Sequence, residues 1–207
     1  MESLYSHRSH IVLGFHGCDA SLAEKVVLGE VMLNRSNHDY DWLGPGIYFW
    51  ENNFQRAKQW AEDNVGKSGP SIRKPGVLGA YVDLGFCLDL TDSESLQQLE
   101  MAYDALSKSI ELTKLTMPVN ADPISVKPKD RVIRKLDCAV IQTLHTLRKE
   151  SGLPLYDSVR GVFWEGEDLY PGAGFKEKNH IQIAILNPNC IKGFFLPREV
   201  DEHFAIP

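Results

Sequence analysis

Cysteines are few and scattered in this chain of 207 residues. The four of them stand far apart with no Cys-x-x-Cys pair, which argues against a zinc ribbon or a disulfide framework and favours reduced thiols. They are Cys18, Cys87, Cys138 and Cys190. The opening residues are polar, no signal-type apolar segment follows them, and no apolar run approaches the length of a membrane span. We therefore expect a cytoplasmic protein with no membrane contact and no metal site.

Positive charge is also in short supply. Lys and Arg number 22 against 28 Asp and Glu, so the formal net charge is −6. This weakens the case for a nucleic-acid partner without excluding one, because phosphate binding needs local rather than overall positive potential. The densest basic cluster is typical of the solvated start of a helix, and contact with nucleic acid or an acidic partner is the less favoured alternative. It consists of Lys127, Lys129, Arg131, Arg134 and Lys135.

Internal repeats and low-complexity segments are absent too, so we expect one domain over 1–207. Alternating or aromatic runs predict strands over 11–16, 47–50, 77–84, 86–90, 158–164, 179–186 and 191–196, with 86–90 as the continuation or the partner of 77–84. Apolar residues at helical spacing predict helices over 22–28, 54–64, 94–115 and 131–150. Three prolines make 117–130 irregular. The pattern is that of an α+β domain with a helical insertion at 92–150.

The most informative stretch is 42–51, Trp-Leu-Gly-Pro-Gly-Ile-Tyr-Phe-Trp-Glu. Glycines on both sides of Pro45 predict a sharp turn, and the aromatic run after it predicts a strand. Alternation along that strand favours Phe49 for the core and Tyr48 for the side of a site. The ring of Tyr48 can stack on an aromatic ligand, an interaction of about 1 kcal/mol.

Two other predicted strands carry polar residues that suit a ligand. His16 and Gly17 end the first strand, where glycine lets a ligand approach the backbone N–H and C=O. Those two groups suit a planar carboxamide, and the histidine can bond a ribose hydroxyl. Gln182 interrupts an apolar strand and faces the side opposite to its neighbours. His180 shares that side and can act as a base near neutral pH.

These three segments resemble the motifs of the ADP-ribosyltransferase superfamily, in its poly(ADP-ribose) polymerase-like branch. Phe15-His16-Gly17-Cys18 is similar to the first motif, 44–49 to the second, and 182–188 to the third, which usually begins with glutamate. The resemblance covers about 10–90 and 156–197 and leaves the helical middle unmatched. It implies a split mixed β-sheet core with flanking helices.

The resemblance also implies an activity, mono-ADP-ribosyl transfer from NAD as co-substrate to a macromolecular acceptor that contacts the loop 165–178. The implied NAD-binding residues are His16, Gly17, Gly46, Tyr48, Phe49 and Gln182. The implied catalytic residues are Gln182, His16, Tyr48 and His180. Because an amide stabilises a developing cation less than a carboxylate does, Gln182 in the glutamate position points either to mono-ADP-ribosylation or to an inactive protein. Carboxylates of the preceding loop can compensate, namely Glu165, Glu167, Asp168 and Glu177.

Several alternatives stay open at this point. One alternative is a transferase that acts as a toxin or defence effector, which would bring a neutralising partner protein. Another is an inactive member of the fold that binds NAD or ADP-ribose. An NAD-dependent RNA 2′-phosphotransferase would need several arginines along the cleft, and the chain has only scattered ones, Arg56, Arg73, Arg134 and Arg160. Gln182 as a plain edge-strand residue, Glu165 as part of a polar loop and Cys18 as a core thiol are the structural alternatives. The insertion covers the cleft, binds a partner or enlarges the core.

Overall fold

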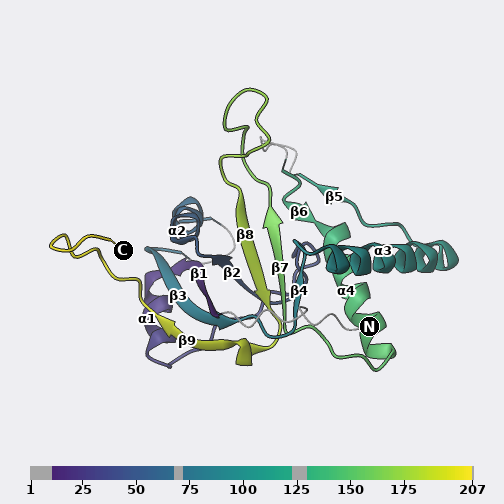
Figure 1. Cartoon of the computed structure of the whole chain (residues 1–207), viewed down its shortest axis with the longest axis horizontal. Helices are drawn as coiled ribbons and strands as arrows, with labels where there is room; N and C mark the ends of the chain where they lie inside the picture. The colour runs from purple at the N-terminus through teal and green to yellow at the C-terminus, as the bar shows by residue number, and fades with distance from the viewer. Residues whose placement is uncertain (1–10, 68–71, 123–129, 207) are drawn as a thin grey trace.

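The computed structural model describes residues 11–67, 72–122 and 130–206. Within these ranges the architecture is α+β, with a seven-stranded mixed sheet and four helices (Figure 1). Lys127 and Lys129 of the basic cluster, and Pro123 and Pro128 of the expected irregular segment, lie outside the described residues. No helix in the described part of the chain is long and apolar enough to cross a membrane.

Every helix and strand expected from the sequence is present, with its ends shifted by a few residues. The strands are β1 (Ile11–Asp19), β2 (Ile47–Glu51), β3 (Pro75–Asp83), β4 (Cys87–Asp89), β5 (Asn120–Ala121), β6 (Ile133–Arg134), β7 (Ser158–Phe163), β8 (His180–Ile185) and β9 (Ile191–Phe195). The helices are α1 (Ala20–Val27), α2 (Phe54–Asp63), α3 (Ser93–Thr113) and α4 (Lys135–Glu150), and a 3-10 turn covers Pro188–Cys190. The short pair β5 and β6 was not expected, and it delays the start of α4 from 131 to 135.

Side-chain caps explain where three of the helices begin. Asp19 accepts a hydrogen bond from the backbone N–H of Ser21 at 3.0 Å and caps α1. Asn53 caps α2 in the same way, and Asp92 caps α3. Each cap satisfies one of the N–H groups that a helix start leaves unpaired, which stabilises the helix by about 1 kcal/mol.

The large sheet has the strand order β4-β7-β8-β2-β1-β3-β9, and its neighbours are antiparallel except for the parallel pair β4 and β7. The expectation that 86–90 continues or pairs with 77–84 is therefore wrong. Gly85 turns the chain at a φ of +60°, and the carboxylate of Asp157 accepts from the N–H of Phe86 at 2.9 Å. These two features carry β4 to the far edge of the sheet, beside β7.

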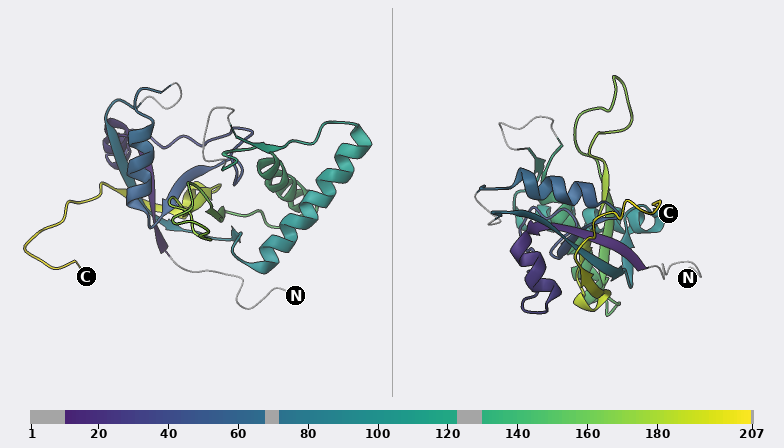
Figure 2. Two further views of the ribbon diagram at one scale, coloured as in Figure 1. Left: turned by 90° about the horizontal axis from the view of Figure 1, so that it is seen from above. Right: turned by 90° about the vertical axis from the view of Figure 1, so that its left-hand side faces the viewer.

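The helices divide between the two faces of the sheet. On one face, α1 packs over an apolar cluster that contains Phe49 and Ile183. On the opposite face, α2 packs over Trp50, while α3 and α4 pack over Val159 and Ala184. Figure 2 shows α1 and α2 on opposite sides of the strands. The second face thus has two separate apolar clusters with a space between them.

The sheet is split at the seam between β1 and β2. These strands pair only at Gly14↔Glu51 and Phe15↔Trp50, whereas β1 and β3 pair along the whole of β1. Beyond Phe15 the two strands separate on the side where the candidate site lies.

The insertion is part of the same packed domain. Helices α3 and α4 contact each other and share a buried cluster with β4, β7 and β8. Figure 1 shows the far end of α3 extending beyond the rest of the molecule. The insertion therefore does enlarge the core, and its further role follows from the site.

Candidate functional site

A cavity of about 790 Å³ lies where β1 and β2 separate, between α2 and the segment 36–42. Small-molecule and cofactor sites commonly occupy about 300–1,000 Å³. Five of the seven site residues expected from the sequence line this cavity, namely His16, Gly17, Tyr48, His180 and Gln182. Three separate strands, β1, β2 and β8, therefore contribute to one site.

Gly17 presents its backbone to the cavity because of the split. Leu13 O accepts from Asn52 N at 2.8 Å, so the backbone groups of Leu13 face β2. Because backbone direction alternates along a strand, the N–H and C=O of Gly17 face the same way. A continued ladder would place Gly17 opposite Tyr48, but the side chain of His16 bonds the Tyr48 carbonyl instead, with Nδ1 to O at 2.8 Å. The peptide groups of Gly17 are thus directed at the cavity.

His16 has a defined protonation state. A carbonyl oxygen only accepts, so Nδ1 of His16 holds the proton and donates to Tyr48. Burial lowers the pKa of His16, so the ring is neutral near pH 7. Its Nε2 therefore offers a lone pair as a hydrogen-bond acceptor.

The ring of Tyr48 is fixed by the turn that precedes its strand. Its hydroxyl donates to Gly44 O at 2.7 Å and accepts from Leu43 N at 3.1 Å. Burial, with a smaller effect from Asp41, raises the pKa of Tyr48, so the hydroxyl stays protonated. The sharp turn noted in the sequence thus orients the aromatic ring that lines the cavity.

Gln182 is held by a residue that the sequence did not single out. The indole Nε1 of Trp42 donates to Oε1 of Gln182 at 2.6 Å. Trp42 lies on the segment 36–42 and lines the cavity beside Gln182. Gln182 faces the cavity, whereas its neighbour Ile183 is buried in the core on the other face, as alternation predicted.

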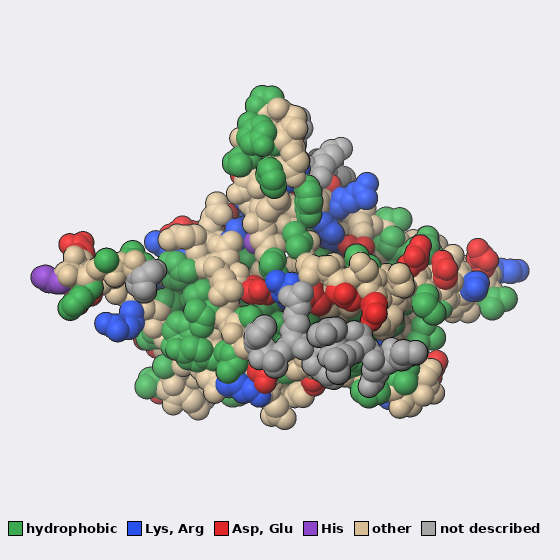
Figure 3. Space-filling model, viewed as in Figure 1, with side chains coloured by type: hydrophobic (Ala, Val, Ile, Leu, Met, Phe, Trp, Pro, Cys, Tyr) green, Lys and Arg blue, Asp and Glu red, His purple; other side chains and the backbone are tan. Residues whose placement is uncertain are grey.

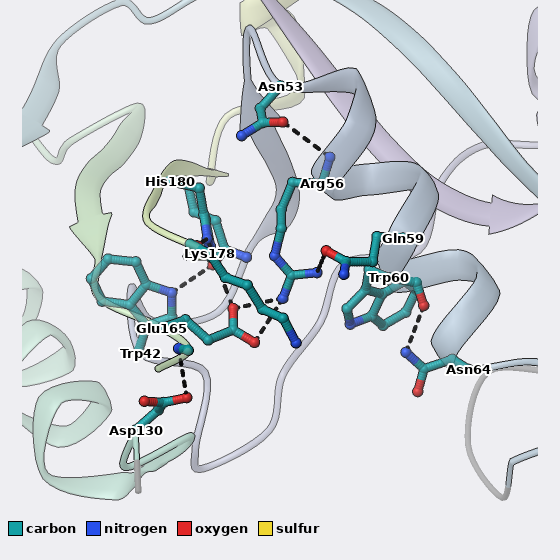
Figure 4. A network of polar contacts seen from close by, with 12 residues as sticks. Trp42, Asn53, Arg56, Gln59, Trp60, Asn64, Asp130, Glu165, Lys178 and His180 are labelled. Atoms are coloured by element: carbon teal, nitrogen blue, oxygen red, sulfur yellow. Dashed lines mark hydrogen bonds and ion pairs between the residues drawn. The ribbon is translucent and has the colours of Figure 1, made fainter. Parts of the chain in front are cut away.

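A buried ion pair lines the polar end of the cavity (Figure 4). Arg56 on α2 forms two hydrogen bonds to the carboxylate of Glu165, at 2.6 and 2.7 Å, and both side chains are largely buried. His180 lies close by, with its Nδ1 3.8 Å from Glu165 and 2.7 Å from the carbonyl of Lys178. Burial lowers the pKa of His180, so its ring is neutral with the proton on Nδ1. Glu165 therefore lines the cavity, but its charge is already balanced by Arg56.

Three polar atoms of cavity residues have no hydrogen-bond partner within the described part of the chain. They are Trp50 Nε1, Arg56 Nε and His180 Nε2. Two are donors and one is an acceptor. A buried polar atom without a partner costs about 1–3 kcal/mol, so a polar ligand that bonds these atoms would gain affinity.

The insertion forms one wall of the cavity. Val132 lines it directly, and the guanidinium of Arg134 lies over the rings of Phe163 and Trp42, at 4.4 and 5.6 Å from their centroids. The Asp130 carboxylate accepts from the N–H of Gly166 at 3.0 Å. Lys135 pairs with Asp39 at 2.6 Å and ties the segment 36–42 to α4. Both sides of the cavity mouth are thus anchored to the insertion.

Two of the expected NAD-binding residues do not reach the cavity. Phe49 is fully buried in the core on the opposite face, as its place in the alternation favoured. Gly46 exchanges backbone hydrogen bonds with Ser36, and a Cβ there would lie tightly, 3.0 Å from the carbonyl oxygen of Ile185. These positions shape the turn and the strand rather than the site.

Other sequence expectations also receive a structural place. Burial raises the pKa of Cys18 to about 11, so this thiol stays protonated and belongs to the core. Of the four scattered arginines, Arg56 lines the cavity, while Arg160 bonds Glu51 and Asp89. An arginine-lined phosphate cleft is therefore not what the described residues form.

The loop 165–178 projects as an ordered arm beyond β7 and β8 (Figure 1). Asp168 and Lys176 pair across it at 2.7 Å, and Leu169 N donates to Phe175 O at 3.0 Å. Its tip carries exposed apolar side chains, seen in green at the top of Figure 3. They include Leu169, Tyr170 and Phe175.

Gly17 is the position where an added methyl group would disturb the site most directly. A Cβ there would lie 2.3 Å from the carbonyl oxygen of Ala57 and 3.1 Å from Trp60, both on α2. Gly17→Ala is expected to displace α2 and to lower the free energy of unfolding by about 1–3 kcal/mol, measured by urea denaturation.

Gly174→Ala is the matched control, because a Cβ at Gly174 meets nothing within 4 Å. Its effect should stay within about 0.5 kcal/mol. If Gly17→Ala were as stable as the control, the close packing of α2 on β1 would be contradicted.

Comparisons with known proteins give one relative without a known activity. The uncharacterized protein MJ0359 of Methanocaldococcus jannaschii is 26% identical over 197 residues, covering 86% of this chain and 83% of that protein. No protein-family model matches the chain. No solved structure matches it either. The chain is therefore similar to a protein that is itself uncharacterized.

Proposed function

We propose that the cavity binds NAD and that the protein transfers a single ADP-ribosyl group from NAD to a macromolecular acceptor. One observation carries the proposal: His16, Gly17, Tyr48 and Gln182, from three different strands, line the same cavity. Their order along the chain and their place on strands are those of the ADP-ribosyltransferase resemblance.

The chemistry of these residues fits the nicotinamide half of NAD. The N–H and C=O of Gly17 match the acceptor and donor of a planar carboxamide. The fixed ring of Tyr48 offers a face on which the nicotinamide ring can stack. A ribose hydroxyl can donate to the free Nε2 of His16 and can accept from Gln182. The carboxamide, the nicotinamide ring and one ribose hydroxyl thus each have a protein partner.

The proposed reaction breaks the bond between nicotinamide N1 and ribose C1′. The electron pair stays on the nitrogen, nicotinamide leaves neutral, and C1′ becomes electron-deficient. An oxygen or nitrogen of the acceptor bonds C1′ and releases a proton, and the neutral His180, which lines the cavity, is the proposed base for that proton. Orientation of the two reactants supplies much of the acceleration.

The acceptor would approach past Arg56. A smaller hollow of about 380 Å³ adjoins the cavity there and shares Arg56 with it, and polar side chains of α2 and of 177–179 line this hollow. The end of the projecting arm 165–178 lines it through Glu177 and Lys178. This arrangement supports a macromolecular acceptor, protein or nucleic acid, as in a toxin or defence effector.

A protein that binds NAD or ADP-ribose without turnover is the second candidate. The bond between Trp42 and Gln182 favours it, because that bond occupies the carbonyl oxygen of the only side chain that stands in the family's glutamate position.

Calorimetric titration with NAD tests the proposal. The wild type should bind, and Tyr48→Ala should bind at least about fivefold more weakly, since loss of the stacked ring removes about 1 kcal/mol. Tyr103→Ala is the control, because Tyr103 is exposed on α3. Labelled NAD then shows whether protein or nucleic acid receives the label. No NAD binding to the wild type, with or without candidate acceptors, would sink the proposal.

A further inference from the structure

We propose that Trp42 is a positioning residue that holds the Gln182 amide with its NH2 group towards the cavity, so that this position donates hydrogen bonds to the ligand and restrains cleavage of the bound NAD. The identity of the ligand rests on the proposed function. The orientation of the amide does not.

The orientation follows from the chemistry of the two side chains. An indole N–H can only donate, so its partner on Gln182 must be the carbonyl oxygen Oε1, 2.6 Å away. The NH2 group of Gln182 then points away from Trp42, and it has no acceptor among the residues that the structure describes. Gln182 is a cavity residue, so this NH2 group is available to a ligand.

Trp42 is itself held in place from three sides. Its ring lies over Gly161, where a Cβ would come within 2.8 Å of it, and Gly161 stands opposite Gln182 in the sheet. Phe163 packs edge-on against Trp42, with ring centroids 5.0 Å apart. The guanidinium of Arg134 covers the ring from the insertion. A side chain so restrained keeps its N–H directed at Gln182.

A fixed donor changes what this position does to a ligand. A ribose hydroxyl can accept from the NH2 of Gln182 and donate to Nε2 of His16, both of which line the cavity. The NH2 group is the positive end of the amide dipole, and it opposes the positive charge that develops on ribose C1′ as nicotinamide leaves. The site therefore binds the ground state of NAD well and stabilises the cation poorly, so water alone cleaves NAD slowly.

Trp42→Phe tests this directly. Phenylalanine keeps the aromatic contact with Phe163 and removes the N–H. The Gln182 amide can then turn its carbonyl oxygen to the ribose, and the rate of nicotinamide release from NAD should rise roughly fivefold, the factor that one hydrogen bond carries. In ¹⁵N spectra, the side-chain NH2 signals of Gln182 should move in Trp42→Phe without any ligand present.

The control is Trp164→Phe, which replaces an exposed tryptophan outside the cavity and should change neither quantity. Gly161→Ala gives a second route, because its Cβ pushes Trp42 from Gln182 and should act like Trp42→Phe. If Trp42→Phe binds NAD but cleaves it at an unchanged or lower rate, the proposal that Trp42 restrains NAD cleavage is wrong. Unmoved Gln182 signals overturn the orientation. No NAD binding by any variant overturns the proposed function instead, and the signals alone then decide the orientation.

Discussion

Gln182→Glu is expected to cleave NAD about 100-fold faster than the wild type. Trp42 can still donate to one carboxylate oxygen, as it does to Oε1 now. The second oxygen then faces the cavity with negative charge, where the amide had the positive end of its dipole. Preorganised charge aimed at a developing ion is worth about 10²–10³ in rate. The rate of nicotinamide release at saturating NAD, quantified by chromatography, measures the change.

Gln97→Glu is the matched control, because it adds the same charge on the exposed surface of α3. It should cleave NAD at the wild-type rate. In the Gln182→Glu background, Trp42→Phe should lower the rate of NAD cleavage rather than raise it. Either oxygen of a carboxylate can face the ribose as an acceptor, so the loss of Trp42 only removes the hydrogen bond that holds the carboxylate in place. A Gln182→Glu variant that binds NAD but cleaves it no faster would contradict both the assigned position and the proposed chemistry.

Arg160→Met is expected to destabilise the fold by about 3–5 kcal/mol, the cost of leaving buried charges without their partner. Arg160 is buried on β7 and bonds Glu51 at 3.0 Å and Asp89 at 3.2 Å. It thereby ties β2, which carries Tyr48, to β4. Methionine has a similar length but no charge, so both carboxylates lose their bonds to the guanidinium. Urea denaturation at neutral pH measures the free energy of unfolding.

Arg198→Met removes an exposed arginine and should change stability by less than about 0.5 kcal/mol. Adding Glu51→Gln to Arg160→Met should recover part of the loss, because one buried charge then disappears. A loss below about 1 kcal/mol in Arg160→Met alone would show that the carboxylates find other partners or water.

Local sequence was enough for much of the fold. The alternation that buries Phe49 while Tyr48 lines the cavity acts within a few residues and is visible in the chain. The position of β4 was not predictable in this way. It depends on Gly85 and on Asp157, which lies 71 residues after the N–H that it accepts from.

The site shows the same division. His16, Gly17, Tyr48 and Gln182 carried a recognisable pattern, and all four line the cavity. Trp42 and Arg56 were missed as site residues, since a tryptophan beside a turn and an arginine on a helix resemble ordinary packing and surface residues. The available signal was Trp42 itself, two residues before the Gly-Pro-Gly turn, because the N–H of its large ring would need a partner once buried.

The pairing of β2 with β8 has a consequence for the order in which the chain folds. The bond between Trp42 and Gln182 spans 140 positions, and β2 pairs with β8 rather than with a nearby strand. Contacts of such long range form late, because the conformational entropy of the long intervening chain is lost before the contact can stabilise the structure. During synthesis the cavity therefore cannot form until β8, which carries His180 and Gln182, has left the ribosome. If the proposed function holds, NAD binding then reports completed folding, and an N-terminal fragment that lacks β8 is expected not to bind NAD.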